Sequence, residues 1–227
     1  LDGDEESITV DQEILFAGGQ FDANIANNAD ELRLADGATI VREATGDAFA
    51  ETPTFEGDVN LEYQGGNDYT TGLEVPDASA DAEVVNLTIN NLSGEVDFRA
   101  GVNTNGSTVA TGNVVVSGTV DLKEGDLVHN LGGVSGSRAL ELSNGATFAQ
   151  RDGVIPSSTS IGGNKVNVGA ITASEYTLVY RPDDSDLNTS GEEFLSGGAV
   201  TTLQIESVPA NEGASPSSQD VLIGQNR

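Results

Sequence analysis

Short stretches in which apolar and polar residues alternate recur along the whole chain. The stretch 31–39 reads Glu-Leu-Arg-Leu-Ala-Asp-Gly-Ala-Thr. This alternation predicts a β-strand with one buried face, and the Asp-Gly step predicts a turn with a left-handed backbone at Gly37. No stretch shows the i, i+3, i+4, i+7 spacing of an amphipathic helix, so the pattern predicts almost no helix.

The same element returns later in the chain. Residues 139–147 read Ala-Leu-Glu-Leu-Ser-Asn-Gly-Ala-Thr, with Gly145 in the position of Gly37. The short motifs at 14–21, 60–63, 71–74 and 85–89 also return, at 120–127, 177–180, 190–193 and 201–205. We therefore predict two related halves of about 110 residues, 8–92 and 114–208, whose loops differ in length.

Strand patterns follow one another every 15–25 residues or so, and two architectures fit this rhythm. One is a parallel β-solenoid that stacks one coil on the next, and the other is a pair of β-sandwiches joined by a linker. The region between the halves is neither Pro-rich nor of low complexity, so it does not resemble a linker. We predict an all-β fold, a right-handed parallel β-solenoid over 8–208, with Gly37 and Gly145 at its corners.

Polar segments flank the predicted solenoid. Residues 1–7 form an acidic leader, and 209–227 form a tail rich in Ser, Asn, Gln and Gly. Within the tail, 220–224 includes the apolar run Val221-Leu222-Ile223, which predicts a short strand. That strand either caps its own solenoid or adds to the edge of a neighbouring subunit.

The order of these motifs carries a resemblance. The succession of motifs resembles the repeat modules of large secreted surface proteins of the Bacteroidota–Rhodothermota group. In chain order these motifs are Leu-x-Leu-x-x-Gly-Ala-Thr, Asn-Leu-x-Tyr, Thr-Gly-x-Glu and Val-Asn-Leu-Thr-Ile-Asn-Asn. The resemblance covers most of residues 8–208 and implies a parallel β-helix exported by the type IX secretion system. The group includes adhesins, surface-layer and matrix proteins, and modules beside enzymes, so the resemblance implies an extracellular or cell-surface location rather than one chemistry.

The net charge of −28 narrows the choice of partners. Asp and Glu total 37 against nine Lys and Arg, so the chain repels nucleic acid and anionic membranes. No apolar run approaches the length of about 20 residues needed to span a membrane, so we expect no membrane insertion. Such an acidic surface suits a halophilic protein working in concentrated salt, because salt screens self-repulsion. The alternative is an ordinary acidic secreted protein that its charge keeps soluble.

One acidic loop is a candidate metal site. Asp184, Asp186 and Asn188 offer side-chain oxygen atoms at every second position, which is the spacing of the first three ligands in a Ca²⁺-binding loop. The loop departs from the EF-hand pattern, because Thr189 stands at the turn-glycine position and Leu195 at the bidentate-Glu position. A solvated acidic loop is the competing interpretation. Apart from this Ca²⁺ candidate we expect no cofactor.

Catalytic motifs are sparse. His129 is the only histidine and no nucleophile elbow surrounds it, and the chain has no Cys, so neither a triad nor a thiol centre is indicated. The arginines are few and scattered, which disfavours cleavage of acidic polysaccharides. Asn86, Asn91, Asn105 and Asn188 match the glycosylation sequon, as chance allows in an Asn-rich chain.

We therefore expect a non-enzymatic structural protein of a surface fibre, matrix or adhesin, which self-assembles through its solenoid edges and terminal segments. The alternative is a β-helix that binds glycans or degrades polysaccharides. It would need a groove lined with aromatic residues and Arg, and only 5% of this chain is aromatic.

Overall fold

The computed structural model describes residues 7–18, 31–45, 48–50, 52–76, 82–97, 114–128, 140–150, 160–161, 164–165, 171–181, 187–188, 198–206 and 221–222. These residues form β-strands and their corners, with no helix. They include no helix that is long and apolar enough to cross a membrane. The prediction of an all-β chain is thus confirmed.

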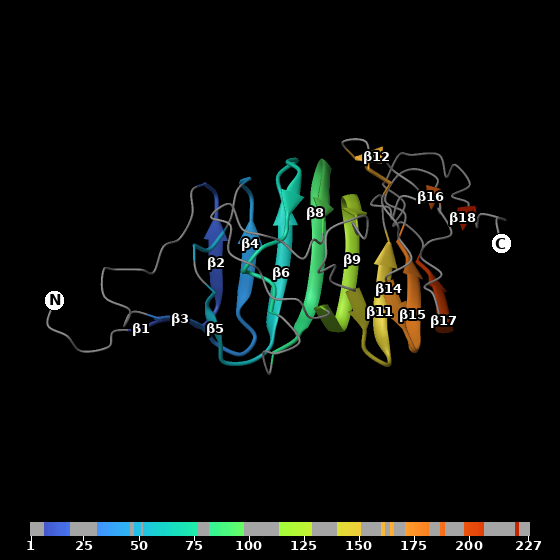
Figure 1. Ribbon diagram of the computed structural model, residues 1–227. Helices are drawn as coiled ribbons and strands as arrows, with labels where there is room; N and C mark the ends of the chain where they lie inside the picture. Colours follow the sequence, from blue (N-terminus) through green and yellow to red (C-terminus); the bar gives the residue numbers. More distant parts are fainter. Residues whose placement is uncertain are drawn as a thin grey trace, which may run out of the picture.

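One ladder of parallel strands runs the length of the molecule (Figure 1). Its members follow one another in sequence order: β2 (Glu13–Phe16), β4 (Thr39–Arg42), β6 (Val59–Gln64), β8 (Val84–Asp97), β9 (Val114–Val128), β11 (Ala146–Gln150), β15 (Glu175–Tyr180) and β17 (Ala199–Ile205). Ile40 pairs with Leu61 and Leu87 pairs with Val120, so one rung follows another after 21 to 33 residues. Parallel neighbours in sequence order require the chain to wind once per rung, which confirms the predicted parallel β-solenoid.

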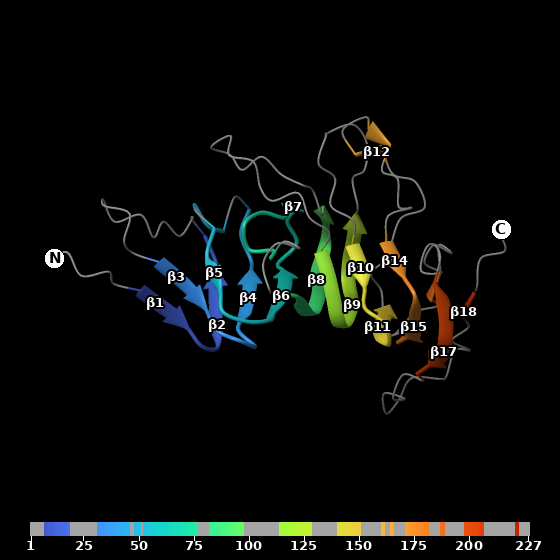
Figure 2. The same cartoon turned by 60° about the horizontal axis from the view of Figure 1, so that its bottom comes forward.

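Further strands form a second wall beside this ladder (Figure 2). At one end, β3 (Glu31–Leu34) lies between β1 (Ser7–Val10) and β5 (Thr54–Phe55). Nearer the other end, β10 (Leu140–Leu142) lies between the first residues of β9 and β14 (Ile171–Ala173). All these pairs are parallel, as the ladder pairs are.

Short pairings complete the structure. β7 (Tyr69–Thr70) pairs with the far end of β8, and β12 (Ser160–Ile161) forms an antiparallel pair with β13 (Asn164–Lys165). β16 (Leu187–Asn188) pairs in parallel with β18 (Val221–Leu222). The predicted terminal strand therefore pairs within its own chain, although Ile223 lies outside the described residues.

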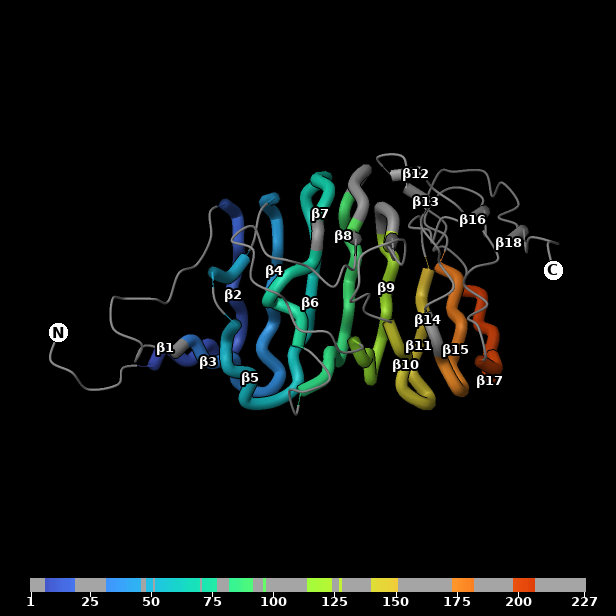
Figure 3. The backbone as a smooth tube through the Cα atoms, in the orientation of Figure 1, coloured from blue at the N-terminus to red at the C-terminus, as the bar shows by residue number. Residues whose placement is uncertain are grey.

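The rungs stack in register along the molecule (Figure 3), and their inward side chains form columns that make up the core. One column is apolar and its central members are 0–2% exposed: Ile14, Ile40, Leu61, Leu87, Val120, Phe148, Leu178 and Leu203. The strand β6 shows how each rung contributes to such columns, since its side chains alternate between buried and half-buried along Val59–Gln64. Each coil is too thin to bury an apolar face alone, so the stacking of rungs supplies the hydrophobic free energy.

The two copies of the repeated motif form the same corner. Gly37 separates β3 from β4 and has a φ of 80°, and Gly145 separates β10 from β11 and has a φ of 84°. The amide of Gly37 donates to the carbonyl of Asp58 on the next rung at 2.7 Å, and the amide of Gly145 donates to that of Glu175 at 2.8 Å. Glycine tolerates this positive φ without a Cβ clash, as the sequence predicted for both corners. The common ancestry of the two halves stays a prediction.

Candidate functional site

A polar cluster is buried inside the first half of the solenoid. Arg42 lies two positions after Ile40 on β4, so its side chain points to the same inward face of the strand. Arg42 is only 1% exposed there. An Nη1 atom of Arg42 donates to Oε1 of Glu74 at 2.5 Å, and Glu74 has no exposed surface. The hydroxyl of Tyr63 donates to the same carboxylate oxygen at 3.1 Å.

Two aromatic rings enclose the guanidinium of Arg42. Its central carbon lies 5.8 Å from the ring centre of Tyr63 and 5.4 Å from that of Tyr69, within the range of a cation–π contact. The Tyr69 hydroxyl donates to the carbonyl of Gln64 at 2.5 Å. Burial lowers the pKa of Arg42, but the Glu74 carboxylate and the tyrosines outweigh this effect, so the pKa is raised overall. The arginine is therefore charged at every working pH.

Burial also raises the pKa of Tyr69 above its ordinary value near 10, against smaller lowering effects of a hydrogen bond with Asn67 and of Arg42. A carboxylate, two tyrosines and an arginine could in principle serve proton transfer. Here each is sealed from solvent, with exposures of 0–2%. A sealed group cannot meet an external substrate, so we assign this cluster to the stability of the stack.

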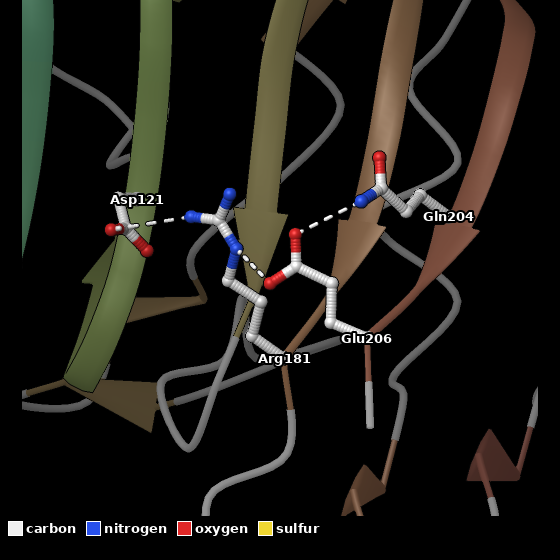
Figure 4. Close-up of polar contacts among 4 residues, drawn as sticks. All are labelled: Asp121, Arg181, Gln204 and Glu206. Carbon is white, nitrogen blue, oxygen red and sulfur yellow. Dashed lines mark hydrogen bonds and ion pairs between the residues drawn. The ribbon is translucent and has the colours of Figure 1, made fainter. Parts of the chain in front are cut away.

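A second arginine ties together the rungs at the far end of the molecule (Figure 4). Arg181, directly after β15, donates from Nε to Oε2 of Glu206 at 2.8 Å. Its Nη1 lies 3.8 Å from Oδ2 of Asp121 on β9, so the side chain reaches across the intervening strand β11. Gln204 of β17 donates to the other oxygen of Glu206 at 3.0 Å. These four residues link the last rung, β17, to the body of the solenoid.

The two ends of the ladder form the candidate interaction surface. Among the described residues, the large hydrophobic side chains that are exposed are Ile8, Leu15, Leu203 and Ile205. The first two lie on β1 and β2 and the last two on β17, which are the outermost strands. In the described part of the chain, large exposed hydrophobic side chains are therefore confined to the ends of the stack.

Register explains why Ile8, Leu203 and Ile205 are apolar. Leu203 pairs with Leu178 and Ile205 with Tyr180, and both partners are completely buried. At the opposite end Ile8 pairs with Leu32, which is 4% exposed. These three positions belong to core columns, and they are exposed because no further rung among the described strands covers them. Each outermost strand of the main ladder, β2 and β17, also has one backbone edge without a ladder partner among the described strands.

The predicted calcium loop falls mostly outside the described residues. Asp184 and Asp186 lie there, and of Asn188 the structure describes the backbone, in β16. The described part of the chain contains no group of three or more His, Cys, Asp or Glu residues placed to hold a metal ion. The Ca²⁺ site stays a prediction, and His129 is likewise outside the described residues.

The asparagine of one glycosylation sequon, Asn91, has a structural role inside the fold. Asn91 is completely buried, accepts a hydrogen bond from the amide of Gly66 at 2.5 Å and donates to the carbonyl of Asn67 at 2.6 Å. It holds the loop at Gly65 and Gly66, which have φ values of 115° and 111°. A glycan cannot be attached to Asn91 in the folded chain. Asn86, in contrast, is exposed and donates to Asn60 at 2.8 Å.

Sequence reasoning missed the Arg42–Glu74 cluster and the Arg181 contacts. One signal for the first was available, since Arg42 lies two positions after Ile40 in an alternating strand and so shares its inward face. Glu74 lies 32 residues further on, and no motif fixes that spacing. The contacts of Arg181 depend on the register of β9, β15 and β17, which the sequence does not give.

No protein-family model, curated protein or solved structure matches this chain. The fold and the geometry of its ends therefore carry the functional argument alone.

Proposed function

We propose that this protein is a non-catalytic structural component of an extracellular fibre, matrix or adhesive surface, and that it self-associates through the ends of its solenoid. The confinement of exposed Ile8, Leu15, Leu203 and Ile205 to the outermost strands carries the proposal. Open strand edges with apolar side chains are ready templates for pairing with another chain. Fully burying one Leu or Ile side chain contributes about 1.5–3 kcal/mol. These side chains are about half exposed, so covering each one in a contact between copies would contribute part of that free energy.

The net charge of the chain predicts how self-association responds to salt. Each copy carries −28, so two copies repel each other in dilute buffer. Between about 0.1 M and about 1 M salt the Debye length falls from about 10 Å to about 3 Å. Association should therefore strengthen as salt rises, in contrast to a contact between opposite charges.

Sedimentation velocity across this salt range, combined with negative-stain imaging, tests the proposal. We expect a monomer at low salt and low concentration, and larger particles or fibres at high salt. The double variant Leu203→Ser and Ile205→Ser should stay monomeric at high salt, with its folding checked by circular dichroism. Dispersed wild-type monomers at every salt and Ca²⁺ concentration would refute self-association.

The carbohydrate-binding alternative finds no support in the tyrosines. Sugar-binding grooves commonly present aromatic faces to the ligand. The four tyrosines of the chain are Tyr63, Tyr69, Tyr176 and Tyr180, and each is at most 2% exposed. A glycan array provides the direct test, and strong hits would replace the structural proposal with the carbohydrate one.

A further inference from the structure

We infer that copies of this chain join head to tail, with β17 of one copy pairing in parallel with β2 of the next. The inference rests on the proposed self-association and specifies its polarity and register. In this arrangement the ladder of one molecule continues directly into the ladder of its neighbour. The contact is heterologous, so it generates a filament rather than a closed dimer.

The first argument is the order of the strands. The ladder runs from β2 to β17 in sequence order and every neighbouring pair is parallel. Its two free edges therefore belong to strands of the same direction on opposite ends of one stack. A translation along the stack brings β17 beside β2 of the next copy as a further parallel pair, the type that the molecule already uses throughout.

The second argument is the continuity of the columns. The column that ends at exposed Leu203 begins at Ile14, and the column that ends at exposed Ile205 begins at Phe16. Stacking in this register places Leu203 on Ile14 and Ile205 on Phe16, so an apolar side chain meets an apolar one in both columns. The first column is apolar at every internal rung, whereas the second also contains Arg42 and Gln150. The neighbouring outward position pairs Gln204 with Leu15, which is 50% exposed in the single copy.

Two other occupants of the β17 edge fit less well. A two-fold contact between two β17 strands would pair them antiparallel and would leave Ile8 and Leu15 of both copies exposed. The chain's own strand β18 pairs with β16 and not with β17. Head-to-tail joining brings the exposed Leu203 and Ile205 of one copy and the β2 edge with Leu15 of the next into one contact.

The absence of cysteine from the natural chain makes the register directly testable. Residues opposite each other on adjacent parallel strands have Cα atoms about 4.8 Å apart, within the range of about 4.4–6.8 Å that a disulfide spans. The test variant carries Leu15→Cys and Gln204→Cys. Mild oxidation at high salt should convert it into a ladder of covalent dimers, trimers and longer chains on a non-reducing gel.

Matched controls separate the alternatives. Gln204→Cys alone should run as a monomer on the non-reducing gel, because head-to-tail contact does not bring two Gln204 positions together. The variant Leu15→Cys with Thr88→Cys should also stay monomeric, because Thr88 occupies the same outward column at an internal rung. Mixing the two single variants, Leu15→Cys and Gln204→Cys, should give one covalent dimer and nothing longer.

Each result decides the inference. A covalent dimer from Gln204→Cys alone would overturn the head-to-tail polarity and support a two-fold contact. Fibres or oligomers in solution without any specific cross-link would overturn the register while the proposed self-association stands. Monomers under all conditions, with no cross-link from any variant, would overturn both.

Discussion

Replacing Glu74 with Gln should strongly destabilise the protein, because the charge of Arg42 stays buried while the carboxylate that it pairs with is lost. Arg42 is 1% exposed and Glu74 is not exposed at all, so water cannot replace the lost carboxylate. Removing one member of such a buried pair typically costs about 3–5 kcal/mol. The hydroxyl of Tyr63 also exchanges a charged acceptor for a neutral one, which adds to the loss.

The chain offers a matched control in an exposed ion pair that also joins two rungs. Nη1 of Arg33 lies 3.0 Å from Oε1 of Glu56, and the two side chains are 40% and 38% exposed. Exposed pairs contribute about 0–1 kcal/mol, so Glu56→Gln should change stability by no more than that. The two substitutions alter the same atoms, and they differ in burial.

A double variant isolates the role of charge. Combining Arg42→Met with Glu74→Gln removes both charges, so it should recover a substantial part of the stability that Glu74→Gln loses. Urea unfolding followed by circular dichroism gives the free energies. Hydrogen exchange of the β4 and β6 amides complements urea unfolding, because it measures local opening of single rungs, which a stacked fold allows. A Glu74→Gln variant no less stable than Glu56→Gln would refute the assignment of this cluster to stability.

Three further predictions concern the corners, the tyrosines and the last rung. Gly57→Ala should lower the melting temperature, because a Cβ there would lie 2.6 Å from the Cβ of Asp36, whereas Gly18→Ala, with nothing within 4 Å, should not. The raised pKa of Tyr69 means that the folded chain holds this proton more tightly than the unfolded chain, so the contribution of Tyr69 to stability is complete below about pH 10 and is lost as the pH rises further. Tyr69→Phe should flatten the fall of stability above about pH 10 in an alkaline denaturation series, and an unchanged slope would contradict this. Arg181→Gln should speed hydrogen exchange in β17 at low salt and less so at high salt, since its ion pairs are partly exposed, and uniform exchange across all rungs would count against this role.

The architecture could be predicted because it depends on local pattern. Alternation at Leu32 and Leu34, and at Leu140 and Leu142, sets one buried face per rung, and the glycine after each stretch sets the corner. The missing linker then favoured one continuous stack. These features depend on residues that are close together in the sequence, so they can be recognised without knowing the fold.

Contacts between rungs could not be predicted in the same way. Rung spacing varies between 21 and 33 residues, so a contact such as Arg42 with Glu74 has no fixed offset in the sequence. The pairing of β8 with β9 contains register shifts, and β8 runs unbroken from Val84 to Asp97, well beyond the strand pattern at 85–89. Exposure of Leu203 and Ile205 also depends on which rung is outermost, and their own pattern predicts burial.

The axial repeat of assembled fibres tests the central claim most directly. The ladder contains eight successive strands, and parallel strands lie about 4.8 Å apart, so head-to-tail copies should repeat about every 38 Å along the fibre. Cryo-electron microscopy or fibre diffraction of the protein assembled at high salt measures this distance together with the strand spacing. A repeat near 38 Å with strands perpendicular to the fibre axis is the expected result. A protein that stays monomeric at high salt, or fibres whose strands run along the axis, would contradict the account.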